Sequence, residues 1–223
     1  MELRKVANKV DFSSKTQIEP WKGDLFESPD NIFGLKLMFV GLSAYWSHDS
    51  EVDAQHLIED TKKFGVERRE RNAFWTRIQQ VGLGKPVEDT CDDERKQFWH
   101  SIALVNYVPA VVADAARKDP TSEELEWGWR CFKDTFETLR PDCVVGLGWL
   151  VHSEWKKRSK DYNIRQTNLI GKEGKGSHIR KLSTDDHSAQ AVHIRHPSGG
   201  FSSDTWRIPV EALRLHTRAG ERL

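Results

Sequence analysis

Cysteine is scarce in this sequence, and the few residues present lie far apart. Cys91, Cys131 and Cys143 are the only cysteines in 223 residues, and none of them belongs to a Cys-x-x-Cys pair. This spacing excludes a disulfide framework, a four-cysteine iron–sulfur cluster and a zinc site built on paired cysteines. We therefore expect a protein of the reducing cytoplasm, with no metal ion and no cofactor.

Long apolar runs are missing as well. The longest, Leu35–Leu42 and Cys143–Val151, are far shorter than the roughly 20 residues that cross a bilayer, so no membrane partner is expected. Residues Met1–Gln17 mix polar and charged side chains and lack the order of a secretory signal. The length and the 37% hydrophobic content predict a single domain over residues 1–223, in which residues 1–30 form an N-terminal extension.

An excess of either charge is also absent, because 34 Lys and Arg residues balance 34 Asp and Glu residues. The distribution along the chain is nevertheless uneven, since only Asp161 and Glu173 are acidic between residues 156 and 181. Together with its glycines, this segment predicts a basic loop over residues 156–181 that follows a DNA backbone. The alternative is a solvated surface. The basic residues are Lys156, Lys157, Arg158, Lys160, Arg165, Lys172, Lys175, Arg180 and Lys181.

Short apolar runs alternate with longer amphipathic segments along the chain. This alternation is typical of an α/β protein, and it predicts a three-layer α/β/α architecture around a central, mostly parallel four-stranded sheet. The predicted strands are Leu35–Val40, Ile102–Val105, Cys143–Gly148 and Ala191–Ile194.

The helical segments carry recognisable start and stop signals. Residues Glu51–Gln80 predict two helices with a break at Gly65. Thr121 and Glu124 form a capping box, which predicts the start of a helix that ends at Arg140-Pro141. A last helix is predicted over Asp204–Leu215.

Polar residues follow three of the predicted strands. They are the segment Gly41–Trp46, the pair Asn106-Tyr107 and the triplet His196-Pro197-Ser198. Ligands of parallel α/β sheets bind beyond the carboxyl ends of the strands, so we expect these three segments to meet around one pocket.

The order of these motifs resembles the uracil-DNA glycosylase superfamily, and in detail a branch of uncharacterised bacterial members. The resemblance covers residues 35 to about 215. No single motif is specific; the resemblance depends on five of them occurring in the right order. The motifs are Phe98-Trp99-His100-Ser101-Ile102-Ala103, Asn106-Tyr107-Val108, Pro120-Thr121, Phe136 with Leu139-Arg140-Pro141-Asp142, and His196-Pro197-Ser198-Gly199-Gly200-Phe201-Ser202.

The resemblance implies a role in cleaving the bond between a flipped base and its sugar in DNA. Asn106 would bind the base edge and His196 would stabilise the departing base, with Tyr107 beside them. Ser198 and the backbone at Gly199 would hold a flanking phosphate, and Phe201 would fill the gap in the stack. The alternatives are that Asn106 is a turn residue, His196 a structural loop histidine and Phe201 a core residue.

The first motif departs from the family pattern. Related bacterial members carry Gly-Glu-Ser-His-Tyr where this chain has Gly41-Leu42-Ser43-Ala44-Tyr45. Leu42 thus replaces the acid, and Ser43 without an adjacent base is a poor activator of water. Tyr45 and Trp46 remain as stacking surfaces for a base.

Other residues could take over the missing roles. Asp49 or Glu51 could replace the acid, although capping the next helix is the preferred interpretation of both. Arg117 could bind a phosphate or a large base substituent, or it could simply be solvated.

The leading hypothesis is a DNA glycosylase that acts on a modified or damaged base, with catalytic Ser43, Asn106, His196 and Asp49, and defence against phage with altered bases is one setting that fits. The alternative is a DNA-binding protein of the same fold that has lost catalysis. A small-molecule hydrolase is a weaker third interpretation, because no phosphate-binding glycine loop follows a strand.

Overall fold

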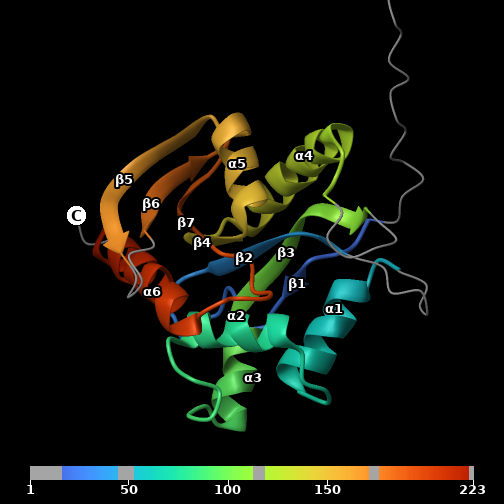
Figure 1. The fold of residues 1–223 in the computed structure, drawn as a ribbon, viewed down its shortest axis with the longest axis vertical. Coiled ribbons are helices and arrows are strands. Elements are labelled where there is room, and N and C mark those ends of the chain that lie inside the picture. The colour runs from blue at the N-terminus through green and yellow to red at the C-terminus, as the bar shows by residue number, and fades with distance from the viewer. Residues whose placement is uncertain (1–16, 45–52, 113–118, 171–175, 221–223) are drawn as a thin grey trace, which may run out of the picture.

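The computed structural model describes residues 17–44, 53–112, 119–170 and 176–220, and for residues 164–170 and 176 it describes the backbone alone. These residues fold into one mixed sheet with helices on both faces (Figure 1). The strands are β1 (Trp21–Lys22), β2 (Leu37–Ala44), β3 (Ile102–Val111), β4 (Cys143–Leu147), β5 (Asp161–Ile170), β6 (Gly176–Ser183) and β7 (Ser188–Ile194).

The sheet has seven strands in the order β1-β3-β2-β4-β7-β6-β5. The four predicted strands correspond to β2, β3, β4 and β7. These four strands pair in parallel with one another in the centre of the sheet. The prediction of a four-stranded sheet is wrong, because β1 adds an antiparallel strand at one edge while β6 and β5 add two at the other. The α/β class is confirmed.

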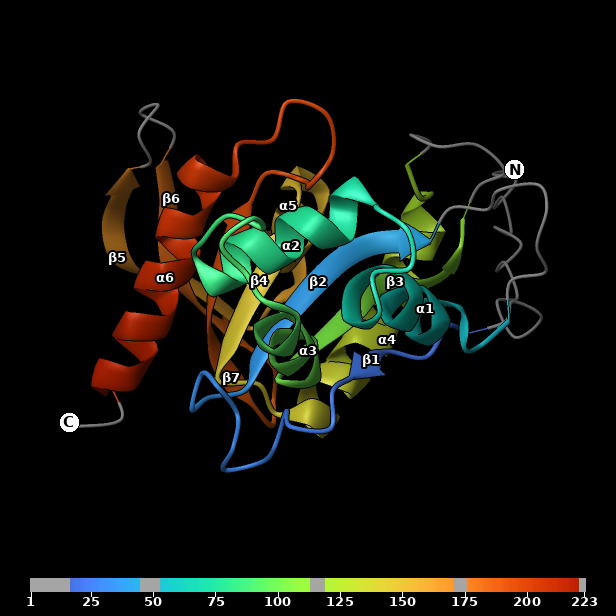
Figure 2. The ribbon, with the colours of Figure 1, turned by 90° about the horizontal axis from the view of Figure 1, so that it is seen from below.

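Helices cover the two faces unequally (Figure 2). One buried cluster joins the sheet to α1, α2, α3 and α6, and a second cluster on the opposite face joins it to α4 and α5. We call these the α2 face and the α5 face. The helices are α1 (His56–Asp60), the π-helix η2 (Thr61–Val66), α2 (Ala73–Leu83), α3 (Asp92–His100), α4 (Ser122–Leu139), α5 (Trp149–Arg158) and α6 (Ser203–Gly220).

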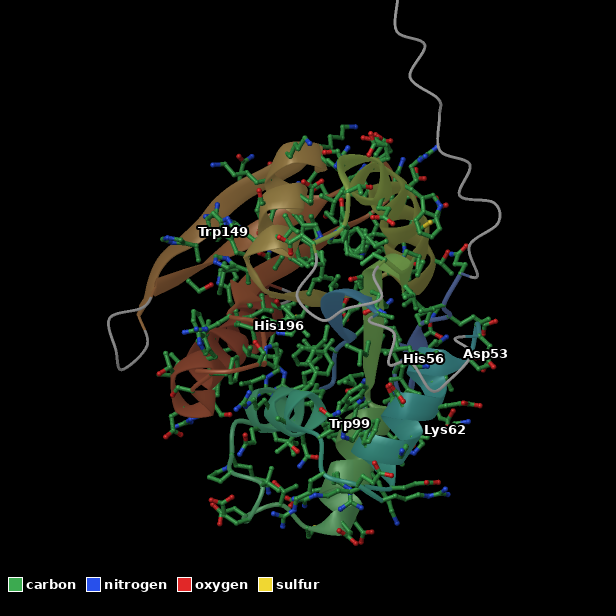
Figure 3. The ribbon with its side chains drawn as sticks, turned by 45° about the vertical axis from the view of Figure 1, so that its right-hand side comes forward. Asp53, His56, Lys62, Trp99, Trp149 and His196 are labelled. Carbon is green, nitrogen blue, oxygen red and sulfur yellow. The ribbon has the colours of Figure 1, made fainter. Side chains whose placement is uncertain are left out.

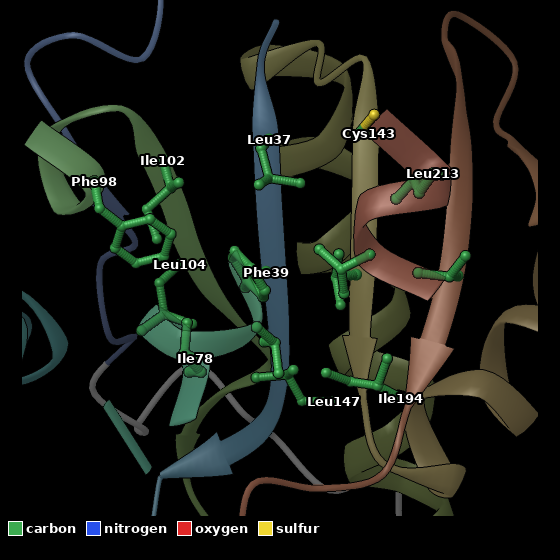
Figure 4. Close-up of a cluster of buried hydrophobic side chains, with 14 of the residues drawn as sticks. Leu37, Phe39, Ile78, Phe98, Ile102, Leu104, Cys143, Leu147, Ile194 and Leu213 are labelled. Atoms are coloured by element: carbon green, nitrogen blue, oxygen red, sulfur yellow. The ribbon is translucent and has the colours of Figure 1, made fainter. Parts of the chain in front are cut away.

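The central strands are apolar on both faces because helices cover both. In β2, Leu37 and Phe39 belong to the cluster on the α2 face, whereas Met38 and Val40 belong to the cluster on the α5 face. All four side chains are fully buried. This two-sided burial is typical of parallel strands, and Figure 4 shows how closely the side chains of the α2 face pack.

The helix predictions are confirmed at α4 and need correction elsewhere. At the start of α4 the Glu124 amide donates to Thr121 Oγ1 at 3.2 Å, and the Thr121 amide donates to the Glu124 carboxylate at 2.8 Å. Gly65 does not break a helix but lies within η2, where a Cβ atom would come 2.7 Å from the indole of Trp99. This glycine therefore allows close packing. The last helix, α6, is longer than predicted.

The predicted basic loop over residues 156–181 is wrong in its described part, which forms the end of α5, β5 and the first strand residues of β6. Several of its charges are occupied within the protein. Arg158 pairs with Glu154 and Glu126, Lys160 with Asp185, and Lys181 with Asp161. The predicted N-terminal extension likewise contributes a strand, since Trp21 of β1 pairs with Leu104 of β3.

Candidate functional site

The four parallel strands place the predicted motifs toward their carboxyl ends. Ser43 lies near the carboxyl end of β2, Asn106 lies in β3, and His196 follows β7. Gly148, between β4 and α5, lies at the same edge. The sheet topology thus brings the three predicted catalytic positions to the edge where parallel α/β proteins bind ligands.

Asn106 does not end its strand, contrary to the prediction. It lies within β3 and pairs in register with Gly41 of β2. A Cβ atom on Gly41 would come 3.0 Å from Asn106 Oδ1, so the glycine makes room for the amide. The half-buried Asn106 also lines a cavity of about 280 Å³ at the β3 edge, together with Gln17, Ile18, Glu19, Pro20, Val105, Pro109 and Thr135.

Ser43 lies where the pairing of β2 with β3 becomes irregular. Asn106 follows Leu104 on the α2 face by strand alternation. The register shifts between Ser43 and Ala44, and Val108, the register partner of Ser43, packs on the α5 face. The Ser43 hydroxyl is buried and has no hydrogen-bond partner among the described residues. A buried hydroxyl of this kind is normally satisfied by a partner, so this atom is available to a water molecule or a ligand.

Leu42 points the other way. It packs against the cluster on the α5 face, where Val40 also lies. This chain therefore uses position 42 for packing, and an acid that activates water would have to come from another segment.

His196 is held between two elements. Its ring centroid lies 5.7 Å from that of Phe74 at the start of α2, with an angle of 34° between the planes. A Cβ atom on Gly148 would come 3.4 Å from the His196 Cβ. Burial lowers the pKa of His196, so the imidazole is uncharged at neutral pH and can both donate and accept a hydrogen bond. Figure 3 shows His196 between α2 and Trp149.

The loop after His196 is anchored from α2. The Ser198 amide donates to the His196 carbonyl at 2.7 Å, and the Ser198 carbonyl accepts a hydrogen bond from Arg77. Ser198 and Gly199 are exposed, as a phosphate contact requires. Phe201 is only partly exposed and packs against the core cluster of the α2 face, with the Arg77 guanidinium 5.9 Å from its ring centroid. This position favours the structural interpretation of Phe201.

Tyr107 lies on the opposite face from Asn106, contrary to the prediction that both contact substrate. Its side chain is fully buried on the α5 face, with its ring centroid 5.7 Å from that of Phe132. Burial raises the pKa of its hydroxyl, which stays protonated. Tyr107 therefore packs the core and does not reach the α2 face.

The remaining predicted positions, Tyr45, Trp46, Asp49 and Arg117, lie outside the described residues. Asn106 lines one of the cavities formed by described residues. The sequence did not predict two residues of the candidate site. Phe74 packs beside the His196 ring, and Arg77 donates a hydrogen bond to the Ser198 carbonyl.

Within the described ranges, no group of three or more His, Cys, Asp or Glu residues could hold a metal ion. The described helices also include none that is both long and apolar enough to cross a membrane. Comparison of the sequence with models of known protein families, and with curated proteins, gave no match.

Proposed function

We propose that this chain is a DNA glycosylase that takes a flipped, modified or damaged base into the carboxyl edge of its parallel strands, within a uracil-DNA glycosylase-like domain. One observation carries the proposal. The Asn106 amide, the uncharged His196 ring and the Ser43 hydroxyl, which has no partner among the described residues, all lie toward the carboxyl ends of the parallel strands. The cytoplasm is the compartment in which we place this activity.

The chemistry follows from these groups. The Asn106 amide offers a donor and an acceptor to the base edge. As the bond between base and sugar breaks, its electron pair moves to the base, and a hydrogen bond from His196 stabilises that developing negative charge. Water adds to the anomeric carbon and leaves an abasic site, while the base departs with a proton.

The water must be activated from elsewhere, since Leu42 is committed to packing. Asp49 remains the proposed residue for this task. A modified base that departs readily would lower the demand on it, and the small side chains of Ser43 and Ala44 leave room for such a base. Phage DNA with altered bases is a source of such substrates, and defence is the proposed setting.

The test is an abasic-site assay on oligonucleotides with modified bases and on phage genomic DNA, read as strand breaks after alkali. We expect breaks with the wild-type protein and a rate at least about 100-fold lower for His196→Ala. His187→Ala is the matched control, because His187 is a half-buried histidine just before the opposite end of the same strand, bonded to the Pro141 carbonyl. No breaks on any substrate, or equal rates for both variants, would remove the enzymatic proposal.

A DNA-binding protein without catalysis is the second candidate, and the packing of Leu42 into the core favours it. A gel-shift assay beside the abasic-site assay separates the two. The binder would retain salt-sensitive affinity for DNA and form no product.

A further inference from the structure

A second cavity lies on the α5 face, away from Asn106 and Ser43. It is an open pocket of about 750 Å³ between α5 and the strands β5, β6 and β7, which lie side by side in Figure 1. We call it the histidine pocket. Its walls include Trp149, His152, Lys156, His178, Arg180 and His193.

An exposed aromatic platform forms one wall. Trp149, the first residue of α5, is 70% exposed, although large aromatic side chains are usually buried. Its ring centroid lies 4.9 Å from that of His152 and 5.9 Å from that of His193. The two imidazoles stack at 4.0 Å with an angle of 21° between them. Flat surfaces of this kind stack nucleobases whatever their sequence.

Positive charge surrounds this platform. Lys156 and Arg180 line the histidine pocket, and among the described residues no carboxylate lines it. The Arg180 guanidinium lies 5.2 Å from the ring centroid of Tyr162, whose hydroxyl is 2.9 Å from His152 Nδ1. A guanidinium group and an ammonium group that line the same pocket suit a phosphate.

Several polar atoms of residues that line the pocket are buried and have no hydrogen-bond partner among the described side chains and backbone. They are Nδ1 of His178, Nδ1 of His193 and Nε of Arg180. His178 and His193 each lie two residues beyond the Arg180–Ala191 pair of β6 and β7, so they face one another across neighbouring strands. Burial chiefly lowers the pKa of His193 to about 4, so this ring is uncharged and can bond either a donor or an acceptor. Buried polar atoms normally have hydrogen-bond partners, and these three have none among the described residues.

The histidine pocket is connected to the candidate site. Gly148 precedes Trp149, donates its amide to the Ile194 carbonyl at 2.8 Å, and would touch His196 through a Cβ atom at 3.4 Å. The residue that lies next to His196 is therefore followed directly by Trp149 of the histidine pocket.

We infer that the histidine pocket binds one unpaired nucleotide of single-stranded DNA, with its base stacked on Trp149 and its phosphate held by Lys156 and Arg180. This inference rests on the proposed function, because it places the nucleotide next to the flipped one.

The test measures the affinity of the full chain for a short fluorescent oligothymidylate by anisotropy. We expect Trp149→Ala to weaken binding about tenfold or more. Leu215→Ala is the matched control, because Leu215 is another exposed large hydrophobic residue, 59% exposed, and lies on α6 outside the histidine pocket. Equal binding by wild type and Trp149→Ala, or no binding by wild type, would overturn the inference.

Two neighbouring lysines provide a second contrast. Lys156 lines the histidine pocket, whereas the exposed Lys157 of the same helix does not. Lys156→Gln should reduce the salt dependence of binding by about 0.7 in the slope of log affinity against log salt, and Lys157→Gln should leave it unchanged. Equal slopes for the two variants would contradict a phosphate at Lys156.

The abasic-site assay on the same preparations distinguishes the two proposals. Protein that binds oligothymidylate through Trp149 and forms no abasic site on any substrate would overturn the proposed function alone. Protein that forms abasic sites and binds equally with and without Trp149 would overturn this inference alone.

Discussion

The strands β2 and β4 in the centre of the sheet differ in composition from the strands β6 and β7 beside them. In β2 and β4 nearly every side chain is apolar and buried, as in Cys143–Leu147. In β6 and β7, polar side chains such as His178, Arg180 and Gln190 alternate with buried apolar ones. Both regions belong to the same sheet.

The difference separates stability from recognition. The parallel strands gain free energy by burying apolar surface on both faces. The strands β6 and β7 also bury polar atoms, and those of His178, His193 and Gln190 have no hydrogen-bond partner among the described residues. Such atoms reduce stability unless something binds them. We therefore expect mutations of the buried apolar residues in β2 and β4 to affect folding, and mutations of these polar residues in β6 and β7 to affect binding.

The largest contrast is expected between Phe39→Ala and Tyr162→Phe. Phe39 is fully buried in β2 and its ring lies 6.3 Å from Phe98, so removing it should lower the free energy of unfolding by about 3–5 kcal/mol. Tyr162→Phe removes only a hydroxyl contact to His152, which corresponds to about 1 kcal/mol. Urea denaturation measures both. A loss for Tyr162→Phe as large as that for Phe39→Ala would contradict the separation.

Two glycines provide the next contrast. A Cβ atom on Gly146 of β4 would come 2.8 Å from the Trp155 ring, so Gly146→Ala should cost about 1–3 kcal/mol by overpacking. A Cβ atom on Gly199 would meet nothing within 4 Å, so Gly199→Ala should change stability by less than about 0.5 kcal/mol. Thermal unfolding of the two variants checks this. Equal losses would mean that the sheet relaxes around Gly146.

The sequence predicts the parallel part of the fold well and the antiparallel part poorly. Continuous apolar runs such as Cys143–Leu147 are visible because helices cover both faces. The sequence predicts a loop at β6, because His178, Arg180 and Lys181 interrupt the apolar pattern of Ile179 and Leu182. Its stability comes from pairing with β5 and β7, which a linear pattern does not contain.

The candidate site shows the same limit. Topology alone places Ser43 and His196 at one edge, because parallel strands share their carboxyl ends. The contact between Arg77 and the Ser198 carbonyl joins residues 121 positions apart, and no local pattern marks it. The faces of Asn106 and Tyr107 follow from strand alternation, but that applies only once Asn106 is known to lie within β3.

The last contrast concerns the dependence of stability on pH, which we attribute to His152 of α5 and His193 of β7. Burial is the main cause that lowers the pKa of His152 from 6.5 to about 3 and that of His193 to about 4, with further contributions from Arg180 and His178, and from Lys156 at His152. Below pH 6.5 the unfolded chain binds protons that the folded chain does not. The contribution of these two histidines to the free energy of unfolding is therefore fully present above about pH 6.5, and it is lost as the pH decreases toward 4.

We expect a decrease of about 1 kcal/mol per pH unit for each of the two histidines, measured by urea denaturation between pH 7 and pH 5. His193→Gln removes one titrating group and should make this decrease smaller. Phe39→Ala lowers stability by burying less apolar surface, so its loss should be the same at both pH values. If His193→Gln left the pH dependence unchanged, the histidine rings would be solvated in the folded protein. The buried histidine nitrogens would then no longer distinguish β6 and β7 from β2 and β4.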